Sequence, residues 1–432
     1  MKLGRGPAPV LRGTVSMPGD KSVSHRALIL GALAEGASTV TGINSGADVR
    51  GTARMLGQLG APCDLDAENH KVQIEGQGWD GLVEPEEPLD AGNSGTSLRL
   101  LLAVCAGLDG ASVLTGDESL RRRPMLRVVA PLRQMGAHID GRRYGDRAPL
   151  FVRGGKLSGL DFESMVASAQ VKTAVLLAGL RASGRTSVRE PALSRDHTER
   201  MLAAAGVQLD RDGPTTVSVR GGSNISPMEW LVPGDVSAAM FFVVAALILP
   251  GSDVTIASVG LNPTRIAALD VLGRMGAEIE IRPAGEGSGE PVGDLRIRHS
   301  ELTGTEVSPG EIPALIDEVP ALAIAATQAS GATVIRGASE LRVKESDRVS
   351  ALANGLSALG AEVEELDDGL IIRGPSQLGG GEVQSHGDHR IAMAFAVAGL
   401  ATPSLVRVRD WSCVETSFPG FLDALDGVRE HA

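Results

Sequence analysis

The chain has 432 residues, of which 43% are hydrophobic and 22% charged, so it allows about two to four domains with large cores and excludes global disorder. Its formal net charge of −12 repels a phosphate backbone and argues against a nucleic-acid binder. Any anion site must therefore be a local cluster of cations.

Three scattered cysteines, at positions 63, 105 and 413, exclude a disulfide framework and lack the spacing of a metal knuckle. The first residues lack the apolar stretch of a signal peptide, so we expect a cytoplasmic protein. The longest apolar run, 238–249, has 12 residues, whereas a membrane span needs about 20. We therefore expect a buried core helix there, and no membrane partner.

A helix of small and apolar residues, followed by a β-branched stretch, recurs six times along the chain. The turn residues between helix and stretch are separated by 74, 74, 67, 80 and 72 residues: Gly36, Gly110, Gly184, Gly251, Gly331 and Pro403. Six units of about 72 residues fill the chain, which indicates an internal repeat.

A second, amphipathic helix follows each of the first five copies. Each such helix ends at a glycine typical of a C-terminal cap: Gly60, Gly136, Gly206, Gly276 and Gly360. Short stretches that alternate apolar and polar residues come next and predict half-buried strands. Each unit is thus expected to contain a helix, a strand, a second helix and two more strands.

Six such units exceed the size of a single core, so we expect two domains of three units each. The tripeptide PGD precedes a repeat helix at Pro18–Asp20 and again at Pro233–Asp235. We place a hinge near Asp20/Lys21 and Gly234/Asp235. The N-terminal domain is then 21–234, and the C-terminal domain is 1–20 plus 235–432, so that the first strand belongs to the second domain.

Polar residues interrupt the apolar pattern where several helices begin. The first helix starts with Lys21, Ser22 and Arg26, and the second repeat helix follows GNSGT. Free N–H groups and a positive dipole make such starts suitable for anions. A simple helix cap at Asp20 or Ser22 is the alternative.

Two further segments combine cations with polar groups. Arg121, Arg122 and Arg123 are adjacent, which suits either a solvated loop or bidentate anion contacts. Ser168, Gln170 and Lys172 interrupt the start of the third repeat helix.

Charged residues also mark the second half of the chain. Asp317 and Glu318 lie between apolar stretches, where a carboxylate suits base chemistry, although a helix cap would explain them equally. The segments 340–348 and 387–390 hold charges that surface ion pairs could explain. Since most of these segments precede the first helix of a unit, we expect them to converge on a cationic cleft that binds small polyanions.

Taken together, the segments resemble the 5-enolpyruvylshikimate-3-phosphate (EPSP) synthase family along essentially the full chain. The matching stretches, in order, are PGDKSVSHRALI, GNSGTSLRLL, RRRPM, ASAQVKTAVLLAGL, SRDHTERML, RVKESDR, GDHRIAMA and TSFPGF. The resemblance implies an α/β fold with two domains, an inside-out α/β barrel built from six βαβαββ repeats, three per domain.

The resemblance also implies the reaction: an enolpyruvyl group passes from phosphoenolpyruvate to the 5-hydroxyl of shikimate 3-phosphate, with release of phosphate, through a tetrahedral intermediate. The implied contacts of shikimate 3-phosphate are Lys21, Ser22, Arg26, Ser168, Ala169, Gln170, Arg195, Asp317 and Lys344. Those of phosphoenolpyruvate are Lys21, Gly95, Arg123, Gln170, Arg348 and Arg390. Asp317 and Glu345 are the implied proton-transfer groups, with Lys21 as electrostatic and acid partner. We expect a monomer that uses no metal and no organic cofactor.

Two positions depart from the family pattern. Ala169 stands where many relatives have a second serine, and Thr416 where many have a lysine. Two rival functions remain. UDP-N-acetylglucosamine enolpyruvyl transferases typically use a loop cysteine in the region of 119–125, which contains none here. A sugar-phosphate sensor without catalysis would keep the cations but need neither Asp317 nor Glu345.

Overall fold

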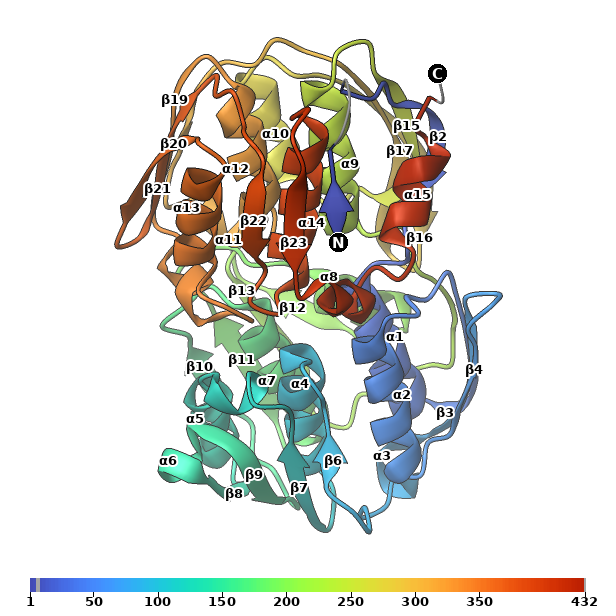
Figure 1. Ribbon diagram of the computed structural model, residues 1–432. Coiled ribbons are helices and arrows are strands. Elements are labelled where there is room, and N and C mark those ends of the chain that lie inside the picture. The colour runs from blue at the N-terminus through green and yellow to red at the C-terminus, as the bar shows by residue number, and fades with distance from the viewer. Residues whose placement is uncertain (5–7, 431–432) are drawn as a thin grey trace. The chain divides into compact units, whose positions relative to one another are not determined.

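The computed structural model describes residues 1–4 and 8–430, and the chain forms two compact units (Figure 1). The first unit comprises Gly19–Val232 together with Glu286–Glu290. The second unit comprises Met1–Pro18, Pro233–Gly285 and Pro291–Ala432. The five residues of Glu286–Glu290 fall within the range predicted for the C-terminal domain, but their contacts group them with the first unit.

The first unit contains three four-stranded sheets. In spatial order their strands are β14 (Glu229–Leu231), β3 (Glu35–Thr41), β5 (Lys71–Gln77) and β4 (Cys63–Asp66); β6 (Leu89–Asp90), β7 (Ala111–Thr115), β9 (Arg147–Arg153) and β8 (His138–Gly141); and β10 (Asp161–Glu163), β11 (Arg185–Arg189), β13 (Thr216–Arg220) and β12 (Leu209–Arg211). Within each sheet the first pair is parallel and the other two are antiparallel. The same order in all three sheets reflects the sequence repeat.

Its helices are α1 (Lys21–Leu33), α2 (Ala47–Gln58), α3 (Gly78–Gly81), α4 (Gly95–Ala106), α5 (Leu126–Gln134), α6 (Arg142–Gly145), α7 (Ala169–Arg181) and α8 (His197–Ala204), with a short 3₁₀ turn at Leu120–Arg122. The first helix of each repeat, α1, α4 or α7, is buried along most of its length. A helix that is apolar all round must be surrounded by protein, and these three form the centre of the unit.

The described residues of the second unit form two four-stranded sheets and one three-stranded sheet. Their strands are β16 (Glu278–Gly287), β17 (Glu290–Arg298), β15 (Asp253–Gly260) and β2 (Arg12–Ser16); β18 (Glu306–Val307), β19 (Gly331–Ile335), β21 (Gly369–Gly374) and β20 (Glu362–Leu366); and β1 (Lys2–Leu3), β23 (Val406–Arg409) and β22 (Gly381–Gln384). The N-terminal strand β2 pairs in parallel with β15.

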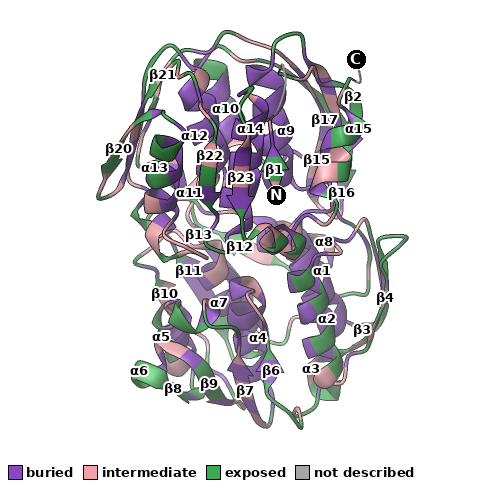
Figure 2. Ribbon diagram, viewed as in Figure 1, coloured by how far each residue is buried: buried purple, intermediate pink, exposed green. Residues whose placement is uncertain are grey.

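The helices of the second unit are α9 (Val236–Ile248), α10 (Ala267–Arg274), α11 (Ile312–Leu315), α12 (Val319–Gln328), α13 (Arg348–Ala358), α14 (His389–Leu400) and α15 (Phe421–Gly427), with 3₁₀ turns at Ser339–Val343 and Trp411–Thr416. Every residue of α9 is buried, as predicted for the long apolar run. Figure 2 shows α9 and α14 buried inside their unit, while the outward faces of the strands carry exposed residues. The helices lie inside and the sheets outside, so each unit has the inside-out α/β arrangement.

The predicted glycine caps are present. Gly60, Gly136, Gly206, Gly276 and Gly360 all have positive φ angles between 86° and 111°. At each helix end the residue after the glycine donates its N–H to a carbonyl five positions earlier, for example Ala61 to Leu56 at 2.9 Å and Ala361 to Leu356 at 3.0 Å. This is the hydrogen-bond pattern of a Schellman cap.

The sixth repeat differs from the other five. In the earlier sheets the strand after the first helix pairs antiparallel with a strand that follows the second helix, as β19 does with β21. In the last sheet the N-terminal strand β1 takes that position, with Lys2 opposite Arg407 and Leu3 opposite Val406. The final repeat is therefore completed by the start of the chain.

Candidate active site

The start of α1 combines a cap with a cation. Asp20 Oδ1 accepts the N–H of Val23 at 2.9 Å, so the predicted cap exists. The next residue, Lys21, forms an ion pair with Asp48 in the first turn of α2, and its side chain keeps 16% of its surface exposed. The cap and the anion-binding interpretation are thus compatible, because different residues serve them. Asp48 was not predicted.

Arg26 lies one turn further along α1 and is 4% exposed. It donates to Thr198 Oγ1 at 2.8 Å, to Thr173 Oγ1 at 2.9 Å and to the carbonyl oxygen of Ser22 at 3.0 Å. Burial lowers the pKa of Arg26 to about 10, while nearby carboxylates, Glu199 first among them, act in the opposite direction. The guanidinium therefore stays charged at neutral pH and ties the start of α1 to α7 and α8.

Hydrogen bonds also join the starts of the other first-unit helices. His25 Nδ1 is 2.8 Å from Thr52 Oγ1, which is 2.6 Å from Ser97 Oγ, so α1, α2 and α4 are linked. Gln170 Nε2 donates to Thr96 Oγ1 at 2.9 Å and links α7 to α4. The first helices of the three repeats, α1, α4 and α7, are thus linked through their N-terminal halves.

Arg99 connects two of the predicted residues, although sequence reasoning did not select it. Its Nη1 donates to Gln170 Oε1 at 2.7 Å and its Nη2 to the carbonyl oxygen of Pro124 at 3.0 Å. A Cβ on Gly95 would lie 2.8 Å from Arg99 Nη1 and 3.3 Å from Arg123 Nη1. Gly95, Arg123 and Gln170 are thus brought together around the Arg99 guanidinium.

The arginine run divides into solvated and inward-facing members. Arg121 and Arg122 are exposed, and Arg122 pairs with Glu118 on the surface. Arg123 is 6% exposed and donates to Asn93 Oδ1 at 2.7 Å. The solvated-loop alternative thus holds for Arg121 and Arg122, whereas Arg123, the residue predicted to contact an anion, is buried.

The start of α7 presents backbone rather than side-chain donors beside Ser168. Ser168 Oγ caps the helix by accepting the N–H of Val171 at 3.5 Å. Ala169 and Gln170 occupy the first two helical positions, whose amides have no preceding turn to accept them. Arg195 lies in the loop before α8 and is partly exposed.

In the second unit, Asp317 lies between α11 and α12 among three cations. Its Oδ1 is 3.1 Å from Arg348 Nη1, 3.6 Å from Lys344 Nζ and 3.8 Å from Arg390 Nε. The Asp317 side chain is 13% exposed, so one carboxylate is held in a largely buried cationic environment. Four of the predicted residues meet here.

Arg348 is the buried residue that contacts the carboxylates of this cluster. It is 1% exposed, and it donates to Asp388 Oδ2 at 2.7 Å and to Glu345 Oε2 at 2.6 Å. Burial alone would lower the pKa of Arg348, but the carboxylates of Asp388, Glu345 and Asp317 raise it above the ordinary value. Asp388 is fully buried and also caps α14 by accepting the N–H of Arg390 at 2.9 Å.

The adjacent carboxylates Asp317 and Glu318 have different surroundings. Glu318 is 1% exposed, accepts a hydrogen bond from Ser237 Oγ and lies 3.8 Å from Arg265 Nη2. It joins the starts of α9 and α12 and has little access to solvent. Thr416, at the position of the missing lysine, donates to the carbonyl oxygen of Cys413 at 2.7 Å and contributes no cation.

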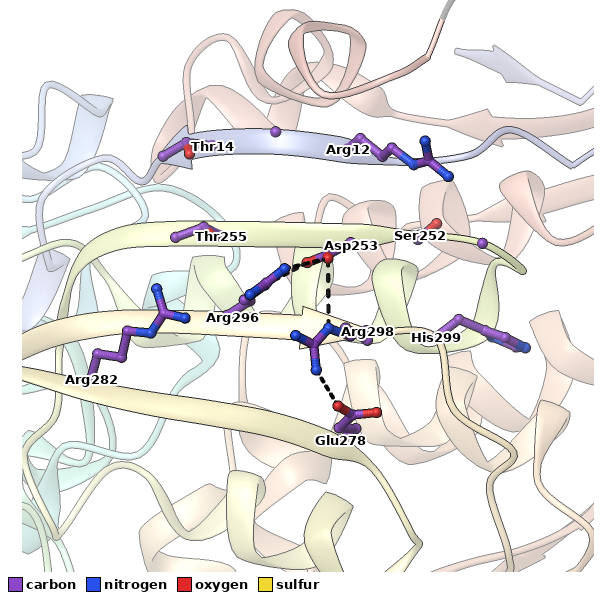
Figure 3. Close-up of a pocket in the computed structure, with 12 residues that line it drawn as sticks. Arg12, Thr14, Ser252, Asp253, Thr255, Glu278, Arg282, Arg296, Arg298 and His299 are labelled. Atoms are coloured by element: carbon purple, nitrogen blue, oxygen red, sulfur yellow. Dashed lines mark hydrogen bonds and ion pairs between the residues drawn. The ribbon is translucent and has the colours of Figure 1, made fainter.

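A cavity of about 780 Å³ on the second unit lies away from these residues (Figure 3). It opens on the outer face of the sheet formed by β2, β15, β17 and β16. Arg296 and Arg298 both contact Asp253, and Arg298 also pairs with Glu278. None of the residues predicted to bind anions lines this cavity, so it is not the predicted anion site.

Residues 1–4 and 8–430 contain no group of three or more histidine, cysteine, aspartate or glutamate side chains placed to hold a metal ion. No helix among them is both long enough and apolar enough to cross a bilayer.

Comparison with known proteins relates this geometry to a family. The model of the family described as EPSP synthase (3-phosphoshikimate 1-carboxyvinyltransferase) matches residues 6–425. The chain belongs to the EPSP synthase family. The 3-phosphoshikimate 1-carboxyvinyltransferase of Citrifermentans bemidjiense is 51% identical over 422 residues, which are 98% of each chain. That of Synechococcus sp. (strain JA-3-3Ab) is 54% identical, over 97% of this chain and 95% of the relative.

Solved structures give the same assignment. The EPSP synthase of Acinetobacter baumannii matches with a TM-score of 0.87 and 42% identity, over 99% of this chain and 98% of the other. The enolpyruvyl transferase NikO of Streptomyces tendae matches with a TM-score of 0.79 at 19% identity, so it supports the fold alone. The family resemblance and the inside-out α/β fold expected from the sequence are thereby confirmed.

Proposed function

We propose that the chain transfers the enolpyruvyl group of phosphoenolpyruvate to the 5-hydroxyl of shikimate 3-phosphate and releases phosphate, as a step of the shikimate pathway. Family membership supports the reaction, and the observation that carries it is the Asp317 carboxylate within 3.1–3.8 Å of three cations. A base held among cations suits a reaction that joins two anions. A sensor would need the cations but not the carboxylate.

Cations and helix starts of the first unit mainly bind the anionic groups of the substrates. The residues assigned to shikimate 3-phosphate are Lys21, Ser22, Arg26, Ser168, Ala169, Gln170, Arg195, Asp317 and Lys344. Those assigned to phosphoenolpyruvate are Lys21, Gly95, Arg123, Gln170, Arg348 and Arg390. Helix starts supply free N–H groups, and guanidinium groups bind phosphate and carboxylate in a bidentate manner.

Asp317 and Glu345 carry the proton transfers. Asp317 accepts the proton of the 5-hydroxyl while the hydroxyl oxygen bonds to C2 of phosphoenolpyruvate. At the same time C3 of phosphoenolpyruvate gains a proton. The resulting tetrahedral intermediate then loses phosphate from C2 and a proton from C3, which restores the double bond. Glu345, held by Arg348, is the carboxyl that we assign to the proton gain and loss at C3. Lys21 stabilises negative charge on the oxygens of the reacting substrates.

Phosphate release tests the proposal directly. The protein should release phosphate only when both shikimate 3-phosphate and phosphoenolpyruvate are present. Binding of shikimate 3-phosphate without release would support the sensor instead, and release with UDP-N-acetylglucosamine as acceptor would support the rival transferase. The monomeric state, the cytoplasmic location and the hinge near Asp20/Lys21 and Gly234/Asp235 remain predictions.

A further inference from the structure

A cluster of buried charged residues lies one turn after the start of α7. Lys172 is 2% exposed, and its Nζ lies 2.8 Å from Glu190 Oε2 and 2.8 Å from Glu199 Oε1. The same nitrogen donates to the carbonyl oxygen of Ser194 at 3.3 Å. The side chains of both glutamates are 1% exposed. Buried ion pairs often add little net stability, because the charges lose their hydration. The cluster therefore suggests a role other than stabilising the fold.

Glu190 uses its other oxygen on the backbone of the helix start. Glu190 Oε1 accepts the N–H of Ser168 at 3.1 Å. The N–H groups of Val171 and Lys172 are taken by Ser168 itself, through its hydroxyl and its carbonyl oxygen. Of the amides in this turn, those of Ala169 and Gln170 are therefore the ones left to bind an anion.

The charges of the cluster also suit a site for a dianion. Glu190 alone would repel a phosphate bound at the start of α7. Lys172 lies between Glu190 and Glu199, and Glu199 also acts on Arg26. The Lys172 ammonium therefore offsets the negative charge of the carboxylate that fixes Ser168.

We propose that Glu190, with Lys172, is a positioning residue for shikimate 3-phosphate: it holds the first turn of α7 so that the amides of Ala169 and Gln170 face the phosphate. The inference rests on the proposed function. In this arrangement the backbone N–H of Ala169 is the donor to the phosphate, so no side-chain hydroxyl is needed at position 169. Gln170 has a second anchor, because its side chain is held by Arg99 and Thr96.

Substitution of Glu190 should affect one substrate more than the other. Glu190→Ala should raise the KM for shikimate 3-phosphate roughly tenfold or more, as expected when a hydrogen bond to a charged group is lost. The KM for phosphoenolpyruvate and kcat should stay within about threefold. Glu190→Gln keeps an oxygen acceptor for Ser168 and should restore most of the loss.

A matched control separates positioning from general destabilisation. Val152 on β9 is fully buried in the same unit, and Val152→Ala should lower the thermal midpoint without changing either KM. If Val152→Ala raised the KM for shikimate 3-phosphate as Glu190→Ala does, the role of Glu190 would be structural and the proposal wrong. An unchanged KM in Glu190→Ala would also overturn it.

A second variant tests the presented amide without touching the buried charges. Ala169→Pro removes the N–H at the first helical position, where proline is well tolerated. Ser168 has φ −139° and ψ 107°, a conformation that a following proline permits. The KM for shikimate 3-phosphate should again rise selectively, and an unchanged value refutes the proposal even if Glu190→Ala does not fold. Absence of phosphate release by the unmodified protein would instead refute the proposed function.

Discussion

Replacement of Gly95 by alanine places one methyl group between two guanidinium groups. The added Cβ would lie 2.8 Å from Arg99 Nη1, closer than side chains tolerate, and 3.3 Å from Arg123 Nη1. Both neighbours are the far ends of flexible side chains, so the fold can adjust by moving them. Arg99 would then release its 2.7 Å bond to Gln170, and Arg123 would move from its position beside Asn93.

The expected size of the effect follows from packing. An extra methyl group in a well-packed region costs ~1–3 kcal/mol. Since about 1.4 kcal/mol corresponds to a factor of ten, the KM for phosphoenolpyruvate should rise roughly five- to 150-fold in Gly95→Ala. Shikimate 3-phosphate should be affected less, because Lys21 and Arg26 are not displaced.

The assay is phosphate release at varied phosphoenolpyruvate, with Gly57→Ala as the matched control. Gly57 also lies in a helix of the first unit, and a Cβ there meets no heavy atom within 4 Å. Its KM should equal that of the unmodified protein. In an Arg99→Met background the Gly95→Ala effect should shrink, because the closest atom is gone. Equal KM values in Gly95→Ala and Gly57→Ala would refute the reasoning.

Three other changes have defined outcomes. Asp317→Asn should lower turnover about 10²- to 10⁴-fold while a thermal-shift titration shows nearly normal shikimate 3-phosphate binding, and turnover within about threefold of normal would contradict its role as base. Asp388→Ala should lower the free energy of unfolding, measured in urea, by about 3–5 kcal/mol, because buried Arg348 loses a partner. Glu118→Ala, which breaks an exposed ion pair, should lower it by less than about 1 kcal/mol. Similar losses in the two variants would argue against a stabilising role for the buried pair. Burial, aided by nearby cations, holds the pKa of His25 well below 6.5, so the unfolded state binds the extra proton. The free energy of unfolding should therefore reach its full value above about pH 6.5 and fall below that pH by at most about 1.4 kcal/mol per pH unit. Urea titrations should show this pH dependence, and His25→Gln should remove it.

The helices of the repeat were predictable because their signals are local. The glycines at 60, 136, 206, 276 and 360 end their helices in the left-handed conformation, and the apolar run at 238–249 forms the buried helix α9. Strands β1 and β6 have two residues each, too few to show any alternation. The role of β1 in the last sheet depends on a partner at the other end of the chain, which no local pattern indicates.

The residue types at the site were predictable, but their partners were not. The resemblance implied Asp317 and Lys344 as contacts of one substrate and Arg348 and Arg390 as contacts of the other, and the structure places all three cations within 4 Å of Asp317 Oδ1. Arg99 was missed because it lies one turn into a helix, beyond the loop that drew attention. Its partner in the fold is 71 positions away, and the sequence does not specify such a pairing.

The pairing of β1 with β23 has a consequence for the order in which the chain folds as it is made. Translation proceeds from the N-terminus, and domains generally fold as units during synthesis. The long segment of the first unit is complete once Val232 has emerged, whereas β2 must wait for β15 and β1 for β23, more than 400 residues after the start. Unpaired strands are templates for association with other chains. The nascent chain therefore carries β1 unpaired until β23 has been made, and in this period a chaperone that covers strand edges would matter most.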